Sequence, residues 1–162
     1  MTSSSRRLSH PVLLGPSAAL LLLAAVGCSS GDATASVTVP SPSPEAAAYC
    51  RALDRELPDT VAGLERSDPE PGSELTAGWG DGAIVLRCGV ERPAKMDDDQ
   101  SKGITANGVN WMLEQRKDDG PRLTTTLRKA YVEVSFSEGY AHDTTPLAAL
   151  APAVKKTVPN RL

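Results

Sequence analysis

One histidine is the clearest candidate for acid–base catalysis in this sequence. His142 is followed directly by Asp143, and the other histidine, His10, lies near the N-terminus. A histidine base oriented by a carboxylate is what a serine hydrolase uses to activate its nucleophile. No G-x-S-x-G or comparable nucleophile motif accompanies this pair. We therefore expect His142 to be a solvated loop residue, and a hydrolase or transferase that uses it is the alternative.

A glycine-rich stretch, AGWGDGAIVLRCGV at residues 77–90, raises the question of phosphate binding. A phosphate loop follows a strand and precedes a helix, where backbone amides or a lysine meet the anion. This stretch precedes an alternating, strand-like run instead, contains no lysine, and places Asp81 where a phosphate would be repelled. The pattern predicts a glycine turn that leads into a strand, with Trp79 packed on the core.

Two further patterns suggest ligands. Trp79 and Trp111, with Asp81, would line a groove for a peptide or glycan, although core packing is the expected role for tryptophans in a domain with so few aromatics. The acidic run at residues 97–99 invites a calcium loop, but Lys102 and Gly108 stand where an EF-hand requires glycine and glutamate. We expect no metal and no cofactor.

The N-terminus determines the chemistry of the first cysteine. Arg6 and Arg7 precede a 16-residue apolar run at residues 11–26, too short to span a bilayer and typical of an export signal. The break at Ala25-Val26-Gly27-Cys28 resembles a bacterial lipobox, which implies cleavage after residue 27 and acylation of Cys28, palmitate included. We expect Sec rather than twin-arginine export. A signal-anchored or secreted protein without lipid is the alternative.

Cleavage at this position makes the chain more acidic. Without Arg6 and Arg7 the mature protein has 15 basic and 20 acidic residues. This balance argues against nucleic acid as a partner. Residues 28–43 are small, polar and proline-bearing, which predicts a flexible tether that O-linked sugar could modify.

Two cysteines remain, Cys50 and Cys88, and their spacing matches no zinc pattern. Cys50 lies on the apolar stripe of a predicted helix, and Cys88 shares a strand face with Ile84 and Leu86. Both thiols therefore point toward one core, and outside the cytoplasm paired thiols oxidise. The sequence predicts a Cys50–Cys88 disulfide.

The periodicities predict a single domain at residues 44–162 of the α+β class. We expect an N-terminal helix that begins at Pro44, a three- to four-stranded antiparallel sheet, and a C-terminal helix that begins at Thr145, with the helices on one sheet face. Pro152 would kink that second helix or mark its true start. Strands are expected at residues 83–90, 109–114, 123–127 and 131–136. The last two runs could be one long bent strand, since Arg128-Lys129 contains no turn residue.

Three motifs together resemble a known family. The segments CRALDRELP at residues 50–58, WGDGAIVLRCGV at 79–90 and GVNW at 108–111 are similar to the actinobacterial family catalogued as domain of unknown function 3515. The resemblance implies an exported, lipoprotein-like chain with one small domain, and no catalytic residues. Genes of this family often neighbour a D-alanine–D-alanine ligase gene, which implies a link to the cell wall.

These observations together predict an exported lipoprotein on the extracytoplasmic face of the cell membrane. Its expected role is non-catalytic, as a binding or assembly module of the cell envelope. The expected partners are the membrane, through the lipid anchor, and an envelope protein or cell-wall component.

Overall fold

The computed structural model describes residues 35–117 and 119–161, which belong to one compact unit spanning residues 31–162. The predicted signal at residues 1–27 and the predicted lipid-bearing Cys28 lie outside the described residues. In the described part of the chain, no helix is both long enough and apolar enough to cross a bilayer.

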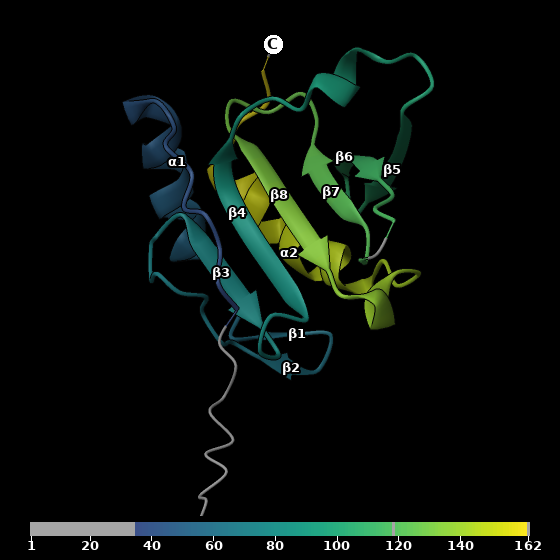
Figure 1. Cartoon of the computed structure of the whole chain (residues 1–162). Helices are drawn as coiled ribbons and strands as arrows, with labels where there is room; N and C mark the ends of the chain where they lie inside the picture. The colour runs from purple at the N-terminus through teal and green to yellow at the C-terminus, as the bar shows by residue number, and fades with distance from the viewer. Residues whose placement is uncertain (1–34, 118, 162) are drawn as a thin grey trace, which may run out of the picture. The chain divides into compact units, whose positions relative to one another are not determined.

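A six-stranded antiparallel sheet forms the centre of the domain (Figure 1). Its strands lie in the order β3-β4-β8-β7-β6-β5, so the last strand of the chain lies between β4 and β7. A separate two-stranded hairpin, β1–β2, precedes the sheet. The strands are β1 (Thr60–Val61), β2 (Leu64–Glu65), β3 (Thr76–Trp79), β4 (Ile84–Val90), β5 (Lys102–Ala106), β6 (Val109–Glu114), β7 (Arg122–Thr125) and β8 (Tyr131–Phe136).

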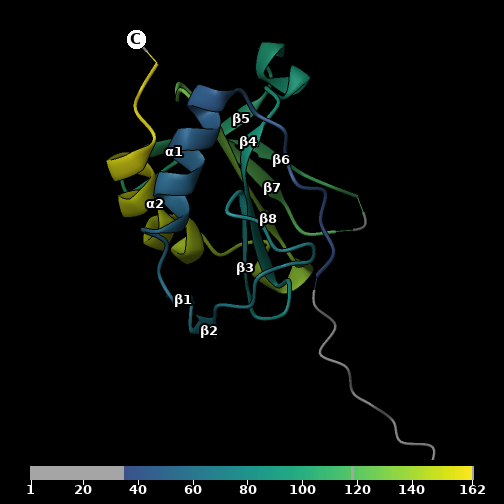
Figure 2. The same cartoon turned by 90° about the vertical axis from the view of Figure 1, so that its left-hand side faces the viewer.

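Two helices, α1 (Pro44–Asp54) and α2 (Thr145–Thr157), pack on the same side of the sheet (Figure 2). Both begin at the residues that the sequence predicts. The Ser43 hydroxyl accepts a hydrogen bond from the Ala46 N–H at 3.3 Å, which satisfies one of the free donors at the start of α1. Two short 3₁₀ helices, η1 (Ala94–Asp97) and η2 (Glu138–Tyr140), lie in the connections.

Pro152 lies inside α2 and neither marks its start nor ends it. A proline has no N–H, so the carbonyl of Ala148, four residues earlier, loses its helical partner. The side-chain amide of Asn107 donates to that carbonyl at 3.4 Å. A side chain from the β5–β6 turn therefore replaces the missing hydrogen bond of the helix.

The hydrophobic core lies between the sheet and the two helices. Alternate residues of the central strands β4 and β8 face each other there and are at most 3% exposed: Ile84, Leu86, Cys88, Val132, Val134 and Phe136. Cys50 of α1 is fully buried and bonded to Cys88, with their Cα atoms 5.5 Å apart. The predicted disulfide is therefore confirmed, as are the α+β class and the antiparallel sheet.

The prediction of three or four strands was too low, because β3 and β5 were missed. The sequence predicts a glycine turn over most of β3 and no strand over β5. Both strands are short, with sequences TAGW and KGITA, and each contains a glycine that interrupts the alternation. Their conformation depends on pairing with β4 and β6, which local sequence does not reveal.

The last two predicted runs are two antiparallel strands, β7 and β8, rather than one bent strand. The chain reverses between them at Leu127, whose φ is +57°. The Arg128 guanidinium then donates to the Val158 carbonyl at 2.7 Å and holds this link against the end of the chain. The reversal uses no glycine, so the residue types between β7 and β8 contain no turn signal.

Candidate functional site

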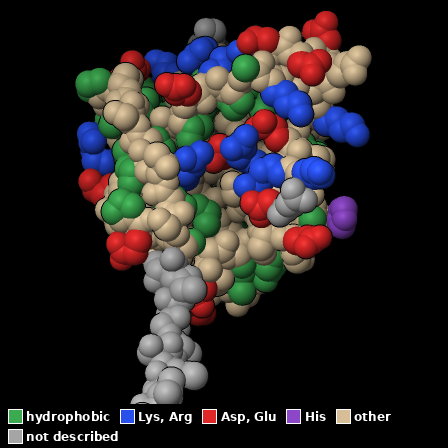
Figure 3. All heavy atoms as spheres, in the orientation of Figure 1, with side chains coloured by type: hydrophobic (Ala, Val, Ile, Leu, Met, Phe, Trp, Pro, Cys, Tyr) green, Lys and Arg blue, Asp and Glu red, His purple; other side chains and the backbone are tan. Residues whose placement is uncertain are grey.

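The sheet has a second face that carries neither helix. The antiparallel register places Arg87 opposite Glu133 and Arg122 opposite Glu114 on this helix-free face. Figure 3 looks onto it and shows Lys and Arg side chains gathered near its centre, with acidic side chains among them. The helix-free face is therefore the charged surface of the domain.

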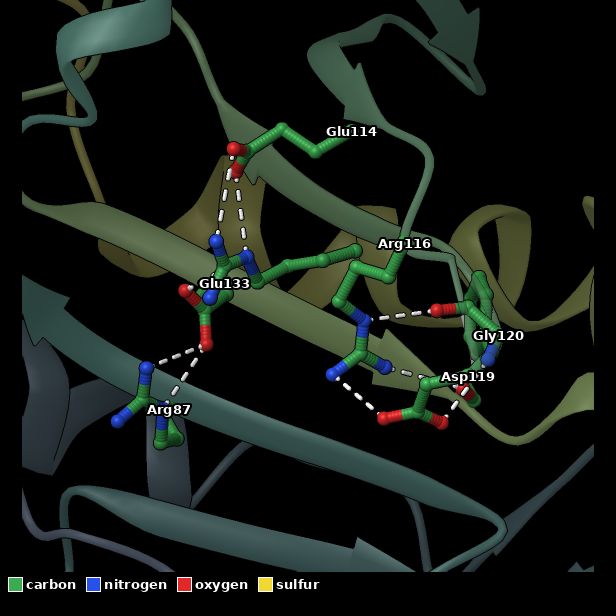
Figure 4. Close-up of polar contacts among 8 residues, drawn as sticks. Arg87, Glu114, Arg116, Asp119, Gly120 and Glu133 are labelled. Atoms are coloured by element: carbon green, nitrogen blue, oxygen red, sulfur yellow. Dashed lines mark hydrogen bonds and ion pairs between the residues drawn. The ribbon is translucent and has the colours of Figure 1, made fainter.

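Four of these side chains form a continuous ladder of ion pairs across β4, β8, β7 and β6 (Figure 4). Arg87 Nη2 lies 2.7 Å from Glu133 Oε1, and Arg122 Nε lies 3.7 Å from Glu133 Oε2. Arg122 Nε also lies 3.2 Å from Glu114 Oε2. The Glu133 side chain is only 7% exposed, so its buried charge depends on the two arginines that flank it.

A third arginine stabilises the turn after β6. Arg116 Nε donates to the Gly120 carbonyl at 2.8 Å, and Arg116 Nη1 lies 2.8 Å from Asp119 Oδ2 (Figure 4). Arg116 Nη2 also donates to the Phe136 carbonyl at 3.4 Å, at the end of β8. This side chain therefore links the β6–β7 turn to the neighbouring strand.

An extended segment, Ala35–Ser43, crosses the helix-free face on the side away from the helices (Figure 2); we call it the N-terminal strap. Its Val37 N–H donates to the Glu70 carbonyl at 2.9 Å, and its Thr38 carbonyl accepts from Arg87 Nη1 at 3.2 Å. The predicted tether, residues 28–43, thus has its described part in contact with the domain. The rest of that prediction lies outside the described residues.

Two glycines make room for the N-terminal strap. A Cβ atom on Gly82 would lie 2.6 Å from Ala35 Cβ, and one on Gly89 would lie 2.6 Å from Pro42 Cγ. Both glycines also have positive φ, +90° and +85°, a conformation that residues with side chains rarely adopt. Gly82 and Gly89 therefore allow the N-terminal strap to pack closely against the domain. The glycine-rich turn leads into strand β4 and not into a phosphate-binding helix.

Beside the strap is a pocket of about 320 Å³. Its walls include Arg87, Arg116 and Arg122, together with Glu133 and Asp119. Each arginine already has a carboxylate partner, so the pocket is polar but largely neutralised. We regard it as part of the structural ladder.

A larger groove of about 580 Å³ lies over β5 and β6, and we call it the β5–β6 groove. Met112 lines the groove from the helix-free face of β6. Leu127 also lines it and is 66% exposed, and among residues 35–117 and 119–161 it is the one large hydrophobic side chain that is exposed. The Arg161 guanidinium stacks over the Tyr131 ring, 5.6 Å from its centroid. The lining has three basic residues, Arg92, Lys102 and Arg161, and one acid, Asp98. Arg92 is paired with Asp97 at 2.7 Å, which leaves Lys102 and Arg161 against Asp98. The lining therefore combines apolar surface with an excess of positive charge.

The structure does not bring Trp79, Asp81 and Trp111 into one groove. Trp79 is fully buried in β3, and its indole N–H donates to the Pro58 carbonyl at 3.0 Å. Three strands separate it from Trp111 in β6, which is 1% exposed. Asp81 lies in the β3–β4 turn with φ of +53° and accepts a hydrogen bond from the Ser67 hydroxyl at 2.9 Å. Only Trp111 contributes to the lining of the β5–β6 groove.

His142 is exposed in the loop before α2 and lines a small cavity of about 160 Å³ that is mostly apolar. Asp143 does not orient it: the Asp143 carboxylate accepts a hydrogen bond from the Thr145 N–H at 2.8 Å, at the start of α2. This bonding to Thr145 holds the pKa of Asp143 below its usual range. The Asp143 carboxylate thus accepts a hydrogen bond from a backbone N–H at the N-terminus of α2.

Two carboxylates of the acidic run at residues 97–99 also bind nearby groups of the chain. Asp97 Oδ1 lies 2.7 Å from Arg92 Nη2, and hydrogen bonding from Arg92 lowers the pKa of Asp97. Asp98 Oδ1 accepts from the Gln100 N–H at 2.9 Å. Within the described residues, no group of three or more His, Cys, Asp or Glu side chains is arranged to hold a metal ion.

The ion-pair ladder and the β5–β6 groove were missed by the sequence analysis. Neighbouring residues in a strand point to opposite faces of the sheet. Arg87 therefore points away from the face that carries Cys88, and Glu133 away from the face that carries Val132, which indicates a polar face. This alternation does not reveal that β4 and β8 are neighbours, which is what brings Arg87 to Glu133. No signal in the sequence identifies the groove, because its lining comes from separate segments between residues 92 and 161.

The fold and the site define a small disulfide-bonded α+β domain with a six-stranded antiparallel sheet and one charged, helix-free face. A family model described as a protein of unknown function, DUF3515, matches residues 12–162. The chain belongs to this family, as its three motifs indicate. No curated protein and no solved structure matches the chain.

Proposed function

We propose that this protein is a non-catalytic binding module of the cell envelope, anchored through lipid on Cys28 at the outer face of the cytoplasmic membrane. The basic start, the short apolar run and the small residues before Cys28 support the anchor. Two or three acyl chains would hold the domain at the bilayer almost permanently.

The N-terminal strap would keep the domain near that membrane. Seven residue steps separate Cys28 from Ala35, the first described residue, whose carbonyl accepts a hydrogen bond from the Glu70 N–H of the domain. A chain of that length spans at most about 25 Å when fully extended. The module would therefore present its surface close to the bilayer and to whatever is assembled there.

Binding is favoured over catalysis by one observation, the β5–β6 groove. Its volume of about 580 Å³ lies within the range of ligand sites, and its lining combines apolar and basic side chains without a histidine. His142 lines a different and smaller cavity, so the groove has no general base of that kind. The alternative of a hydrolase or transferase that uses His142 requires activity at the smaller cavity.

The anchor is tested by the intact mass of the native protein extracted from membranes. We expect a chain that begins at Cys28 and carries a diacylglycerol-sized addition. A full-length or unmodified chain would leave the signal-anchored or secreted alternative and remove the lipoprotein proposal.

The groove is tested by photo-cross-linking in cells, with the cross-linking amino acid in place of Leu127 and, as a control, in place of exposed Glu74. We expect a discrete adduct from the first position and none from the second. Arg161→Glu should weaken it, whereas Arg55→Glu, the same charge change away from the groove, and His142→Ala should not. Loss of the protein's activity in His142→Ala alone, with the adduct retained, would favour the enzyme.

A further inference from the structure

The two edges of the sheet differ in how their backbone groups are satisfied. At the β3 edge, the Ser67 N–H donates to the Gly78 carbonyl at 2.8 Å, and the Gly78 N–H donates to Asp68 Oδ1 at 3.4 Å. All four residues of β3 are buried. This edge is covered in the way that folded proteins protect edge strands.

The β5 edge is open within the described part of the chain. Lys102, Gly103 and Thr105 are exposed, and β6 is the only strand that pairs with β5 (Figure 1). An open strand edge presents a row of backbone donors and acceptors to another chain. The question is which backbone groups of β5 point outward.

The hydrogen bonds of β6 show which backbone groups of β5 point away from the sheet. The Asn110 carbonyl accepts from the Thr126 N–H at 2.9 Å, so the backbone of Asn110 points toward β7 and away from β5. Thr105, directly opposite Asn110, is therefore in a non-hydrogen-bonded pair, and its own N–H and C=O point away from β6. Because the pattern repeats every second residue, Gly103 also points its backbone outward. No described residue supplies a backbone partner to these groups.

The surroundings of this edge select the chemistry of a partner. The β5–β6 groove adjoins Gly103 and Thr105, so alternate side chains of an added strand would face it. Gly103 leaves space over β5, and Leu127 supplies exposed apolar surface. Lys102 and Arg161 form no ion pair with a described residue, and only Asp98 among the lining residues opposes them, so the lining favours carboxylates in the incoming segment.

We propose that the edge of β5 binds an extended, acidic segment of another envelope protein as an added β-strand, with its side chains alternately in the β5–β6 groove. Main-chain hydrogen bonds to Gly103 and Thr105 provide the affinity, and the groove provides the selectivity. This rests on the proposed function for where the partner is found. A second copy of this chain is disfavoured as the occupant, since it would bring the same basic groove to this edge.

The test uses the full chain with its disulfide intact and a library of random peptides about seven residues long, enough to pair along β5. The discriminating variants are Gly103→Pro, which removes the outward N–H, and Gly103→Ala, which keeps it. A Cβ at this position meets only the Trp111 carbonyl, at 3.5 Å, an ordinary contact. Thr105→Pro removes the second outward N–H and serves as an independent variant.

We expect the wild type to enrich peptides that alternate apolar and acidic residues. An enriched peptide should bind Gly103→Ala as it binds the wild type, and Gly103→Pro and Thr105→Pro at least about tenfold more weakly. The peptide should also slow hydrogen exchange at the Gly103 and Thr105 amides. Lys102→Glu should reduce the preference for acidic peptides.

Several outcomes would overturn the proposal: no enrichment relative to Gly103→Pro, enriched peptides without acids, or unchanged exchange at both amides. Self-association of the wild type that Gly103→Pro abolishes would make a second copy the occupant instead. Urea midpoints of the variants show whether they remain folded. The selection does not use the lipid anchor or the cross-linking assay, so it can fail while the proposed envelope function stands, and the reverse.

Discussion

We predict that the disulfide between Cys50 and Cys88 contributes much of the stability of this domain. The bond joins α1 to the central strand β4 and closes a loop of 38 positions. Both cysteines are at most 1% exposed, so the link lies inside the core. The change to make is Cys50→Ala with Cys88→Ala, in the chain from residue 28 with Cys28→Ser so that no lipid interferes.

The size of the effect follows from the loop. In the chain-entropy description, a loop of this length constrains the unfolded chain by about 4 kcal/mol. With a urea m-value of about 2 kcal/mol/M for a domain of this size, the unfolding midpoint should fall by about 2 M. Reduction of the unmodified cysteines should have a similar effect, because it opens the same loop without changing the side chains.

The assay is equilibrium urea unfolding followed by tryptophan fluorescence, since Trp79 and Trp111 are both buried. The reduced wild type lacks only the bond, so its comparison with the double variant separates the effect of the link from that of the packed sulfur atoms. A loss below about 1 kcal/mol for the double variant would refute the loop argument. It would mean that the unfolded chain gains little freedom without the link, or that α1 contributes little to the cooperative unit.

Three further predictions concern the helix-free face and the start of α2. Glu133→Ala should cost about 1–3 kcal/mol in urea unfolding, because it leaves Arg87 without its partner at 2.7 Å. Gly89→Ala should displace the N-terminal strap and speed its proteolysis, because the new Cβ meets Pro42 at 2.6 Å and φ is +85°; Gly72→Ala, with no atom within 4 Å, should change nothing. Asp143 has a pKa lowered by its bonds from Thr145, so its contribution to stability is full above the unfolded value of about 3.9 and is lost as pH falls through the lower folded pKa. The gap in urea midpoint between wild type and Asp143→Ala should therefore close at acidic pH.

Each of these has a result that would contradict it. A Glu133→Ala protein as stable as the wild type would show that solvent satisfies both arginines. Equal proteolysis of the Gly89→Ala and Gly72→Ala proteins would show that the strap is not held at Pro42. A gap in midpoint that stays constant down to the most acidic pH would exclude the Asp143 carboxylate as its source.

The sequence by itself determined the elements whose pattern is local. The helix stripe that carries Cys50 and the alternation that carries Cys88 each extend over many residues, so both elements and their buried faces were predictable. The disulfide followed because both cysteines lie on those buried faces. The starts of α1 and α2 were also predictable from local sequence. In each helix a proline in the first turn follows a serine or threonine, and both residue types are common at the N-terminus of a helix.

Only the tertiary structure decided the rest. β3 and β5 are strands because their neighbours supply hydrogen bonds, and a short glycine-containing segment has no strong preference of its own. The position of β8 between β4 and β7 brings Arg87 to Glu133, 46 residues further along the chain. Ser67 and Asp68 cover the edge at Gly78, whereas no described residue supplies a backbone partner to the edge at Gly103. Pairing between distant segments is set by the packing of the whole sheet, and for that reason the face on which we place the function could not be located before the fold was known.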